Sequence, residues 1–145
     1  MLAIVRSETL LGALAFGLIG LIGCGPAVAN LESSSRLAPA ELYSCVVRAL
    51  AQLNYTLQTA DRDAGLVKAE KKASGTATAL FSGAAYYNEI TALVLPPQSG
   101  GPPSLKLTLV RSKQEGRGSR TSTGMVVTGD LKKDGATLQK SCAGV

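Results

Sequence analysis

The sequence predicts an α+β domain in which an N-terminal helix packs on a mostly antiparallel sheet of four to five strands. Three observations predict it: an apolar stripe at helical spacing within residues 39–54, a change to period-two alternation after it, and two apolar segments separated by a Pro- and Gly-rich break. The chain has 145 residues, 46% of them hydrophobic and 17% charged, which fits one globular domain of ordinary size.

The stretch APAELYSCVVRALAQLNY carries the helical pattern. Pro39 is compatible with a first turn, and Asn54 can end the helix. The apolar side chains that recur three and four positions apart are Leu42, Cys45, Val46, Ala49, Leu50 and Leu53. Cys45 therefore lies on the face that we expect to be buried.

After the helix the pattern predicts strands. Residues 55–60 and 66–72 alternate around the turn DRDAG and predict a hairpin, in which Asp61 and Asp63 stabilise the turn. Residues 73–87 are rich in small side chains and are expected to be a mobile connection.

Two further strands, EITALVL and LKLTLV, are separated by PPQSGGPP, with Leu105, Leu107 and Leu109 facing the core. A fifth strand is expected within residues 121–128. A short C-terminal helix is expected to bring Cys142 beside the first helix.

An uncharged apolar run, LLGALAFGLIGLI, precedes the domain. Its 13 residues are too few for the ~20 that a helix needs to cross a bilayer, and they match the core of an export signal. A permanent span is therefore the weaker interpretation, and residues 1–23 are expected to be a signal peptide.

The sequence LIGC at the end of that run resembles the bacterial lipobox, whose cysteine is joined to diacylglycerol and becomes the new amino terminus. The resemblance implies lipid attachment at Cys24, a flexible tether over residues 24–38 and a globular domain over residues 39–145. Because Gly25 rather than Asp follows the cysteine, it implies an outer-membrane lipoprotein facing the periplasm. The alternative is AVA at residues 27–29, which is typical of ordinary signal peptidase and would release a soluble periplasmic or secreted domain.

The cysteine count gives the same prediction under either cleavage. Of three cysteines, Cys24 is lipidated or discarded, so Cys45 and Cys142 remain as a pair in an exported domain and are predicted to form a disulfide. A loop of about 100 residues closed in this way adds up to ~4.7 kcal/mol of stability. Two reduced, buried thiols in a cytosolic protein are the alternative. No CxxC pair supports redox catalysis or a cysteine zinc site.

Positive charge is concentrated in the C-terminal part of the chain. Residues 24–105 hold six basic and six acidic residues, whereas residues 106–145 hold eight basic and three acidic ones and account for the net charge of +5. Such a field favours anionic lipid headgroups, an anionic polymer or an acidic partner, and a solvated hairpin tip is the alternative. The candidate anion-binding residues are Arg111, Lys113, Arg117 and Arg120. Nucleic acid is not expected as a partner, because the stretch has no aromatic residue for base stacking.

The patterns of common catalytic sites are missing from the sequence. It has no histidine, which excludes Ser-His-Asp and Cys-His nucleophiles and His-ligated metals. Neither an SxxK pair nor a P-loop occurs. We therefore expect no enzyme, no cofactor and no metal.

The run LYSCVVRALAQLNYTLQTADRDAGLVKAEKK, residues 42–72, is similar to a pattern of small bacterial envelope lipoproteins: a helix, a short strand after an aromatic residue, an Asp-containing turn with Gly, and a basic strand. The accessory lipoproteins of outer-membrane barrel assembly carry domains of similar helix-on-sheet character. This resemblance implies an envelope setting and the same fold class. The sequence thus favours a non-enzymatic, lipid-anchored envelope protein with a binding or assembly-accessory role. The alternative is a soluble periplasmic domain that binds an anionic ligand through its basic C-terminal region.

Overall fold

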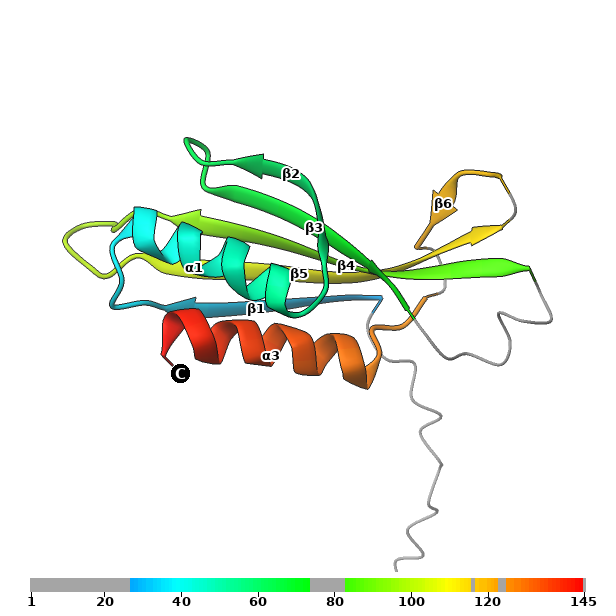
Figure 1. The fold of residues 1–145 in the computed structure, drawn as a ribbon. Coiled ribbons are helices and arrows are strands. Elements are labelled where there is room, and N and C mark those ends of the chain that lie inside the picture. The colour runs from blue at the N-terminus through cyan, green and yellow to red at the C-terminus, as the bar shows by residue number, and fades with distance from the viewer. Residues whose placement is uncertain (1–26, 74–82, 116, 123–124, 145) are drawn as a thin grey trace, which may run out of the picture.

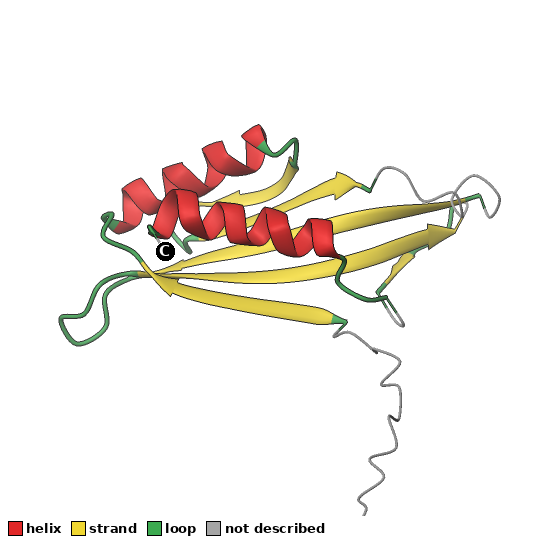
Figure 2. Cartoon of the chain, turned by 90° about the horizontal axis from the view of Figure 1, so that it is seen from below, coloured by secondary structure: helices red, strands yellow, loops and turns green. Residues whose placement is uncertain are grey.

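A computed structural model describes residues 27–73, 83–115, 117–122 and 125–144. All strand pairs are antiparallel. The strand order is β1 (Val28–Ser34), β5 (Ser104–Glu115), β4 (Ala84–Leu95), β3 (Leu66–Lys72) and β2 (Thr56–Asp61), and β6 (Arg120–Thr121) pairs with β5 off this path. Both helices cover the same face of the sheet and leave the other face open (Figures 1 and 2). The predicted α+β class with an antiparallel sheet is confirmed. In the described residues, however, the sheet has six strands rather than four to five, and β1 precedes the first helix.

The first helix, α1 (Pro39–Gln52), follows the predicted stripe. Leu42, Val46, Ala49 and Leu50 are buried on its inner face. Proline in the first turn lacks the N–H that would have no helical acceptor there, so it does not disturb the helix. The chain leaves the helix through Asn54, whose φ of 62° places it in the left-handed region that asparagine tolerates.

The predicted hairpin is formed by β2 (Thr56–Asp61) and β3 (Leu66–Lys72). Asp61 stabilises its turn, because its carboxylate accepts the backbone N–H groups of Asp63 at 3.1 Å and Ala64 at 3.0 Å. Gly65 closes the turn with φ +66°, and a Cβ there would lie 2.4 Å from the carbonyl oxygen of Val94. Only glycine fits this position.

The central strands are longer than predicted. β4 (Ala84–Leu95) and β5 (Ser104–Glu115) have 12 residues each and pair along their whole length. Residues 84–87, which we expected to belong to a connection, are therefore part of β4, because each has a ladder partner in residues 112–115 of β5. The remaining part of that expected connection, residues 74–82, lies outside the described residues.

The expected flexible tether is wrong for residues 28–34. They form the edge strand β1 (Val28–Ser34), which pairs with residues 104–110 of β5. Its inward residues Ala29 and Leu31 pack against the core, while Asn30 and Glu32 face outward. The serine-rich end of the segment suggested a spacer, but this alternation is that of a half-buried strand.

The C-terminal region also differs from the prediction. β6 (Arg120–Thr121) has only two residues. The prediction of a fifth strand within residues 121–128 is therefore wrong for the described residues 122 and 125–128, which form no strand. The C-terminal helix is not short: α3 (Gly129–Ala143) has 15 residues and buries Leu131 and Leu138 against the sheet.

The predicted disulfide is present. It joins Cys45 on α1 to Cys142 on α3, with a Cα–Cα distance of 5.7 Å. Beside it, the buried hydroxyl of Ser35 donates to the carbonyl oxygen of Cys142 at 3.1 Å and accepts the N–H of Leu37 at 3.1 Å. The end of β1 and both helices are thus tied together at one end of the molecule, which we call the disulfide end.

Candidate functional site

The helix-facing side of the sheet changes from apolar to polar along one line that crosses three strands. The last apolar row, all buried, consists of Ala69, Ile90 and Leu109. The next row toward the far ends of β4 and β5 consists of Lys71, Asn88 and Arg111, which we call the polar row. β1, β6 and α3 all have residues at this opposite end: β1 and α3 begin there and β6 lies there (Figures 1 and 2). We call it the basic end.

The four candidate anion-binding residues all lie at the basic end, but the structure does not bring them together on one surface. Arg111 and Lys113 are two residues apart on β5, so both face the helix side of the sheet. Arg120 pairs with Gln114 and faces the open side. Arg117 lies in the turn between β5 and β6. Each residue therefore has its own electrostatic surroundings.

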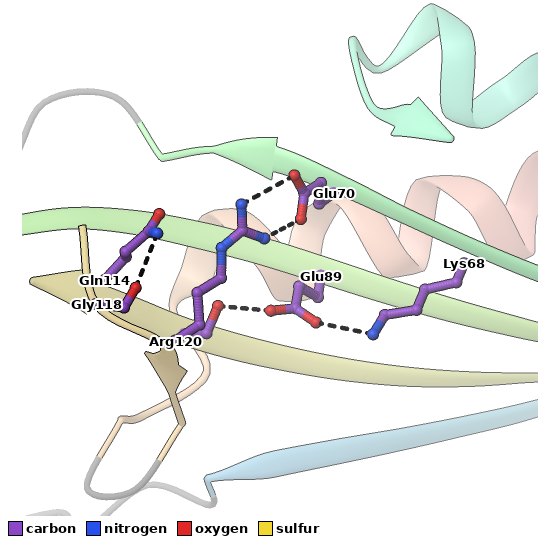
Figure 3. A network of polar contacts seen from close by, with 7 residues as sticks. Lys68, Glu70, Glu89, Gln114, Gly118 and Arg120 are labelled. Carbon is purple, nitrogen blue, oxygen red and sulfur yellow. Dashed lines mark hydrogen bonds and ion pairs between the residues drawn. The ribbon is translucent and has the colours of Figure 1, made fainter. Parts of the chain in front are cut away.

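Arg120 is held by two partners on the open face. Its guanidinium forms a bidentate pair with Glu70 of β3, in which Nη2 lies 3.2 Å from Oε1 (Figure 3). It also stacks on the ring of Tyr87, at 3.8 Å from the centroid. The hydrogen bond to Glu70 raises the pKa of Arg120 above its ordinary value. The arrangement fixes β6 against β3 and leaves the charge of Arg120 compensated.

The neighbouring charges of the open face are matched in the same way. Glu89 accepts a hydrogen bond from the hydroxyl of Ser112 at 2.5 Å and pairs with Lys68 at 3.5 Å (Figure 3). A depression of about 500 Å³ on this face is lined by both ion pairs. Its described residues contribute two basic and two acidic side chains, so it has no excess positive charge for an anion.

Lys113 is also compensated. Its ammonium lies 2.5 Å from the carboxylate of Glu115. This hydrogen bond raises the pKa of Lys113 and lowers the pKa of Glu115. Glu115 is exposed and Lys113 is partly exposed, so the pair weakens the local positive field without building a site.

Arg111 differs from the other three. Its guanidinium lies 5.1 Å from the centroid of the Tyr86 ring, and it has no ion pair with a carboxylate of the described residues. It is the member of the predicted set that lines a cavity on the helix-facing side, beside the first turns of α3.

The wall of that cavity is fixed by a half-buried polar contact between sheet and helix. The ammonium of Lys71 lies 2.6 Å from the carboxylate of Asp134 on α3, 3.2 Å from the carbonyl oxygen of Leu53 and 4.5 Å from the centroid of the Tyr55 ring. The hydroxyl of Tyr55 donates to the same carboxylate at 2.9 Å. Burial and Asp134 together raise the pKa of Tyr55 far above its ordinary value.

Asn88 and Lys71 were not among the candidate residues predicted from the sequence. Both became neighbours of Arg111 only through the strand register, which periodicity alone does not determine. A signal was present: in both long strands the apolar alternation stops at a polar residue, at Asn88 before EITALVL and at Arg111 after LKLTLV.

No helix within the described residues is long and apolar enough to span a membrane. The described parts of the chain likewise contain no group of three or more Cys, Asp or Glu side chains that could hold a metal ion. The leader, the lipobox sequence LIGC and Cys24 lie outside the described residues, whereas the alternative cleavage sequence AVA, residues 27–29, lies within them and enters β1.

Comparison with known proteins gives no family. No protein-family model matches the chain, and no curated protein matches it. Among solved structures, the chain is similar to the crystal structure of Ara h 8.0201, with 13% sequence identity, a TM-score of 0.38, and coverage of 81% of this chain and 95% of that one. A likeness at this level supports no conclusion about ligand or function.

Proposed function

We propose that the chain is a non-enzymatic, lipid-anchored protein of the cell envelope, attached through Cys24, whose basic end faces an anionic membrane surface in a binding or assembly-accessory role. The observation that carries the proposal is the position of β1. The strand begins at Val28, four residues after Cys24, and Val28 pairs with Val110, the neighbour of Arg111. The attachment point and the basic end are therefore close together.

The path of the chain limits how far the domain can lie from its anchor. β1 and β6 pair with the same edge of β5, one after the other along that strand. β1 pairs with residues 104–110 of β5, and β6 pairs with Lys113 and Gln114. Four residues span at most about 14 Å when fully extended. The domain would thus stay near the headgroups, where each Lys or Arg close to an anionic surface contributes about 1 kcal/mol of attraction.

Several basic residues at this end have no ion pair with a described carboxylate, and they are available for that attraction. They are Lys72, Arg111, Arg117, Lys132 and Lys133. The charge of these residues supports a peripheral electrostatic contact with the membrane in addition to the lipid.

The disulfide between Cys45 and Cys142 supports an exported protein, because such bonds persist in oxidising compartments. The strand β1 supports the lipobox over the alternative cleavage. Cutting after Ala29 would remove Val28 and Ala29 from the strand, whereas cutting before Cys24 leaves it whole.

Intact-mass measurement of the protein purified from membranes tests the proposal. We expect a chain that begins at Cys24, carries a diacylglyceryl group and lacks the two hydrogens of the Cys45 and Cys142 thiols. The variant Cys24→Ala should lose the lipid mass and membrane retention, while Cys45→Ala, as a control, should keep the lipid. A mature chain that begins at Asn30 without lipid would contradict the anchor and favour the soluble periplasmic alternative.

A further inference from the structure

A cavity of about 630 Å³ lies at the basic end, between the polar row and the first turns of α3. Lys71, Asn88 and Arg111 line it from the sheet, and Thr128, Asp130 and Lys133 line it from the helix side. It lies beyond the last apolar row, so its walls are polar where the adjoining core is filled by Ile90 and Leu109.

The charge of this cavity is not balanced by its own residues. The residues that line it include the basic Lys71, Lys72, Arg111 and Lys133 and the acidic Asp130 and Asp134. The register of Lys72 with Tyr87 places the Lys72 side chain on the open face of the sheet. Asp134 already pairs with Lys71. Arg111 and Lys133 then face a single remaining carboxylate, in contrast to the matched depression on the open face.

The first turn of α3 adds backbone donors to the same cavity. The N–H of Lys132 is the first to bond within the helix, to the carbonyl oxygen of Thr128 at 3.0 Å, and the side chain of Thr128 makes no capping hydrogen bond. The N–H groups of the first turn therefore lack a helical acceptor, and the helix dipole favours an anion near them.

Asn88 provides an independent indication of a ligand. Its side chain is 4% exposed and lines the cavity, yet its amide oxygen has no hydrogen-bond partner among the described residues. A buried acceptor without a donor is unusual and destabilising in a folded protein. A ligand that presents a hydroxyl or ammonium group at this point would satisfy it.

We propose that this cavity binds a phosphate ester that carries a hydroxyl or ammonium group a few bonds from the phosphate, as in a glycerophosphate. Arg111 and the N–H groups of α3 would contact the phosphate, and Asn88 would accept the neighbouring donor. The ester is either a phospholipid headgroup or a free metabolite, and the headgroup source rests on the membrane orientation proposed above.

Calorimetric titration of the mature protein tests the site. The protein is purified from the membrane or the soluble fraction, wherever it is found, and is titrated in an uncharged detergent. The probes are glycerophosphoglycerol, which is a lipid headgroup without its chains, glycerol 1-phosphate, and methyl and dimethyl phosphate, which lack the extra donor. We expect both glycerol esters to bind about tenfold more tightly than the matching methyl esters, because only they can satisfy Asn88. Tighter binding of the diester indicates the headgroup, and tighter binding of the monoester indicates a free phosphate ester.

Four variants separate the contacts. Arg111→Gln should weaken all phosphates about tenfold or more, whereas Asn88→Leu should abolish only the preference for the glycerol esters and keep the protein folded. Asp130→Asn should strengthen binding severalfold by removing the opposing charge. Arg48→Gln removes an equal charge from the exposed side of α1 and should leave every affinity unchanged.

The proposal is overturned if no phosphate binds, if methyl and glycerol esters bind equally, or if Arg48→Gln weakens binding as much as Arg111→Gln. The mass of the same sample reports the lipid on Cys24 separately. Loss of binding with the lipid present refutes the cavity alone, and binding by a protein without lipid refutes the anchor alone.

Discussion

The disulfide end and the basic end are built from the same three strands, yet different forces hold them. At the disulfide end, Val67, Val94 and Leu105 of β3, β4 and β5 are buried under the two helices. Past the last apolar row the same faces carry the polar row, and the contact between sheet and helix becomes an ion pair. The apolar contacts that stabilise the fold and the charged residues therefore lie in separate halves of one sheet. Substitutions in one half should change the free energy of unfolding, and substitutions in the other should change anion binding.

The largest expected effect is loss of the disulfide. In the paired variant Cys45→Ser with Cys142→Ser, the free energy of unfolding should fall by about 2–5 kcal/mol, because the unfolded chain regains the entropy that the cross-link removes. Chemical denaturation monitored by circular dichroism measures it.

Phosphate binding at the basic end is the control for the paired cysteine variant. The paired variant should still bind glycerol 1-phosphate wherever it is folded, because the disulfide does not touch the cavity. Reduction of the unmodified protein should reproduce the same loss of stability. If the denaturation midpoint were unchanged in both the paired variant and the reduced protein, the stability of the disulfide end would not depend on the cross-link.

A second test concerns the close approach of α3 to the sheet. A Cβ on Gly135 would lie 2.9 Å from a methyl group of Leu109 and 3.0 Å from one of Leu31, so Gly135→Val must displace the helix or both leucines. We expect a loss of about 1–3 kcal/mol in the free energy of unfolding, the usual cost of overpacking. Thermal unfolding with calorimetric detection measures it.

Gly129→Val is the matched control for this helix. A Cβ at Gly129 meets nothing within 4 Å, so the substitution should leave stability nearly unchanged. Both substitutions improve helix propensity, so equal losses of stability would contradict the crowding under Gly135 as the cause.

The sequence predicted the apolar half of the fold better than the polar half. The stripe of α1, the hairpin turn at Asp61 and the alternation of LKLTLV follow from local periodicity and turn chemistry, and each is found in the structure. The disulfide followed from cysteine count and an expected compartment. These features depend on residues close together in the sequence or on simple arithmetic.

The missed features depend on register and edge pairing. β1 joins the sheet through residues 104–110, far along the chain, so a serine-rich segment resembled a tether. Lys71, Asn88 and Arg111 align across three strands only once the ladder is known. A single sequence contains neither the ladder nor the partners that neutralise Lys113 and Arg120, which is why four basic residues resembled one cluster.

The smallest effect concerns Tyr55, which is buried where the two ends meet and donates to Asp134. Its pKa is raised in the folded protein, mainly by burial, so the folded state keeps the proton while the unfolded tyrosine ionises above about pH 10. Its contribution to stability is thus complete below pH 10 and declines as the pH rises, by about 1.4 kcal/mol at pH 11. Denaturation of the protein and of Tyr55→Phe between pH 8 and 11 should give stability differences that shrink by this amount. A difference that stays constant over this range would show that Tyr55 ionises in the folded protein, and that water reaches the junction between the apolar core and the polar row.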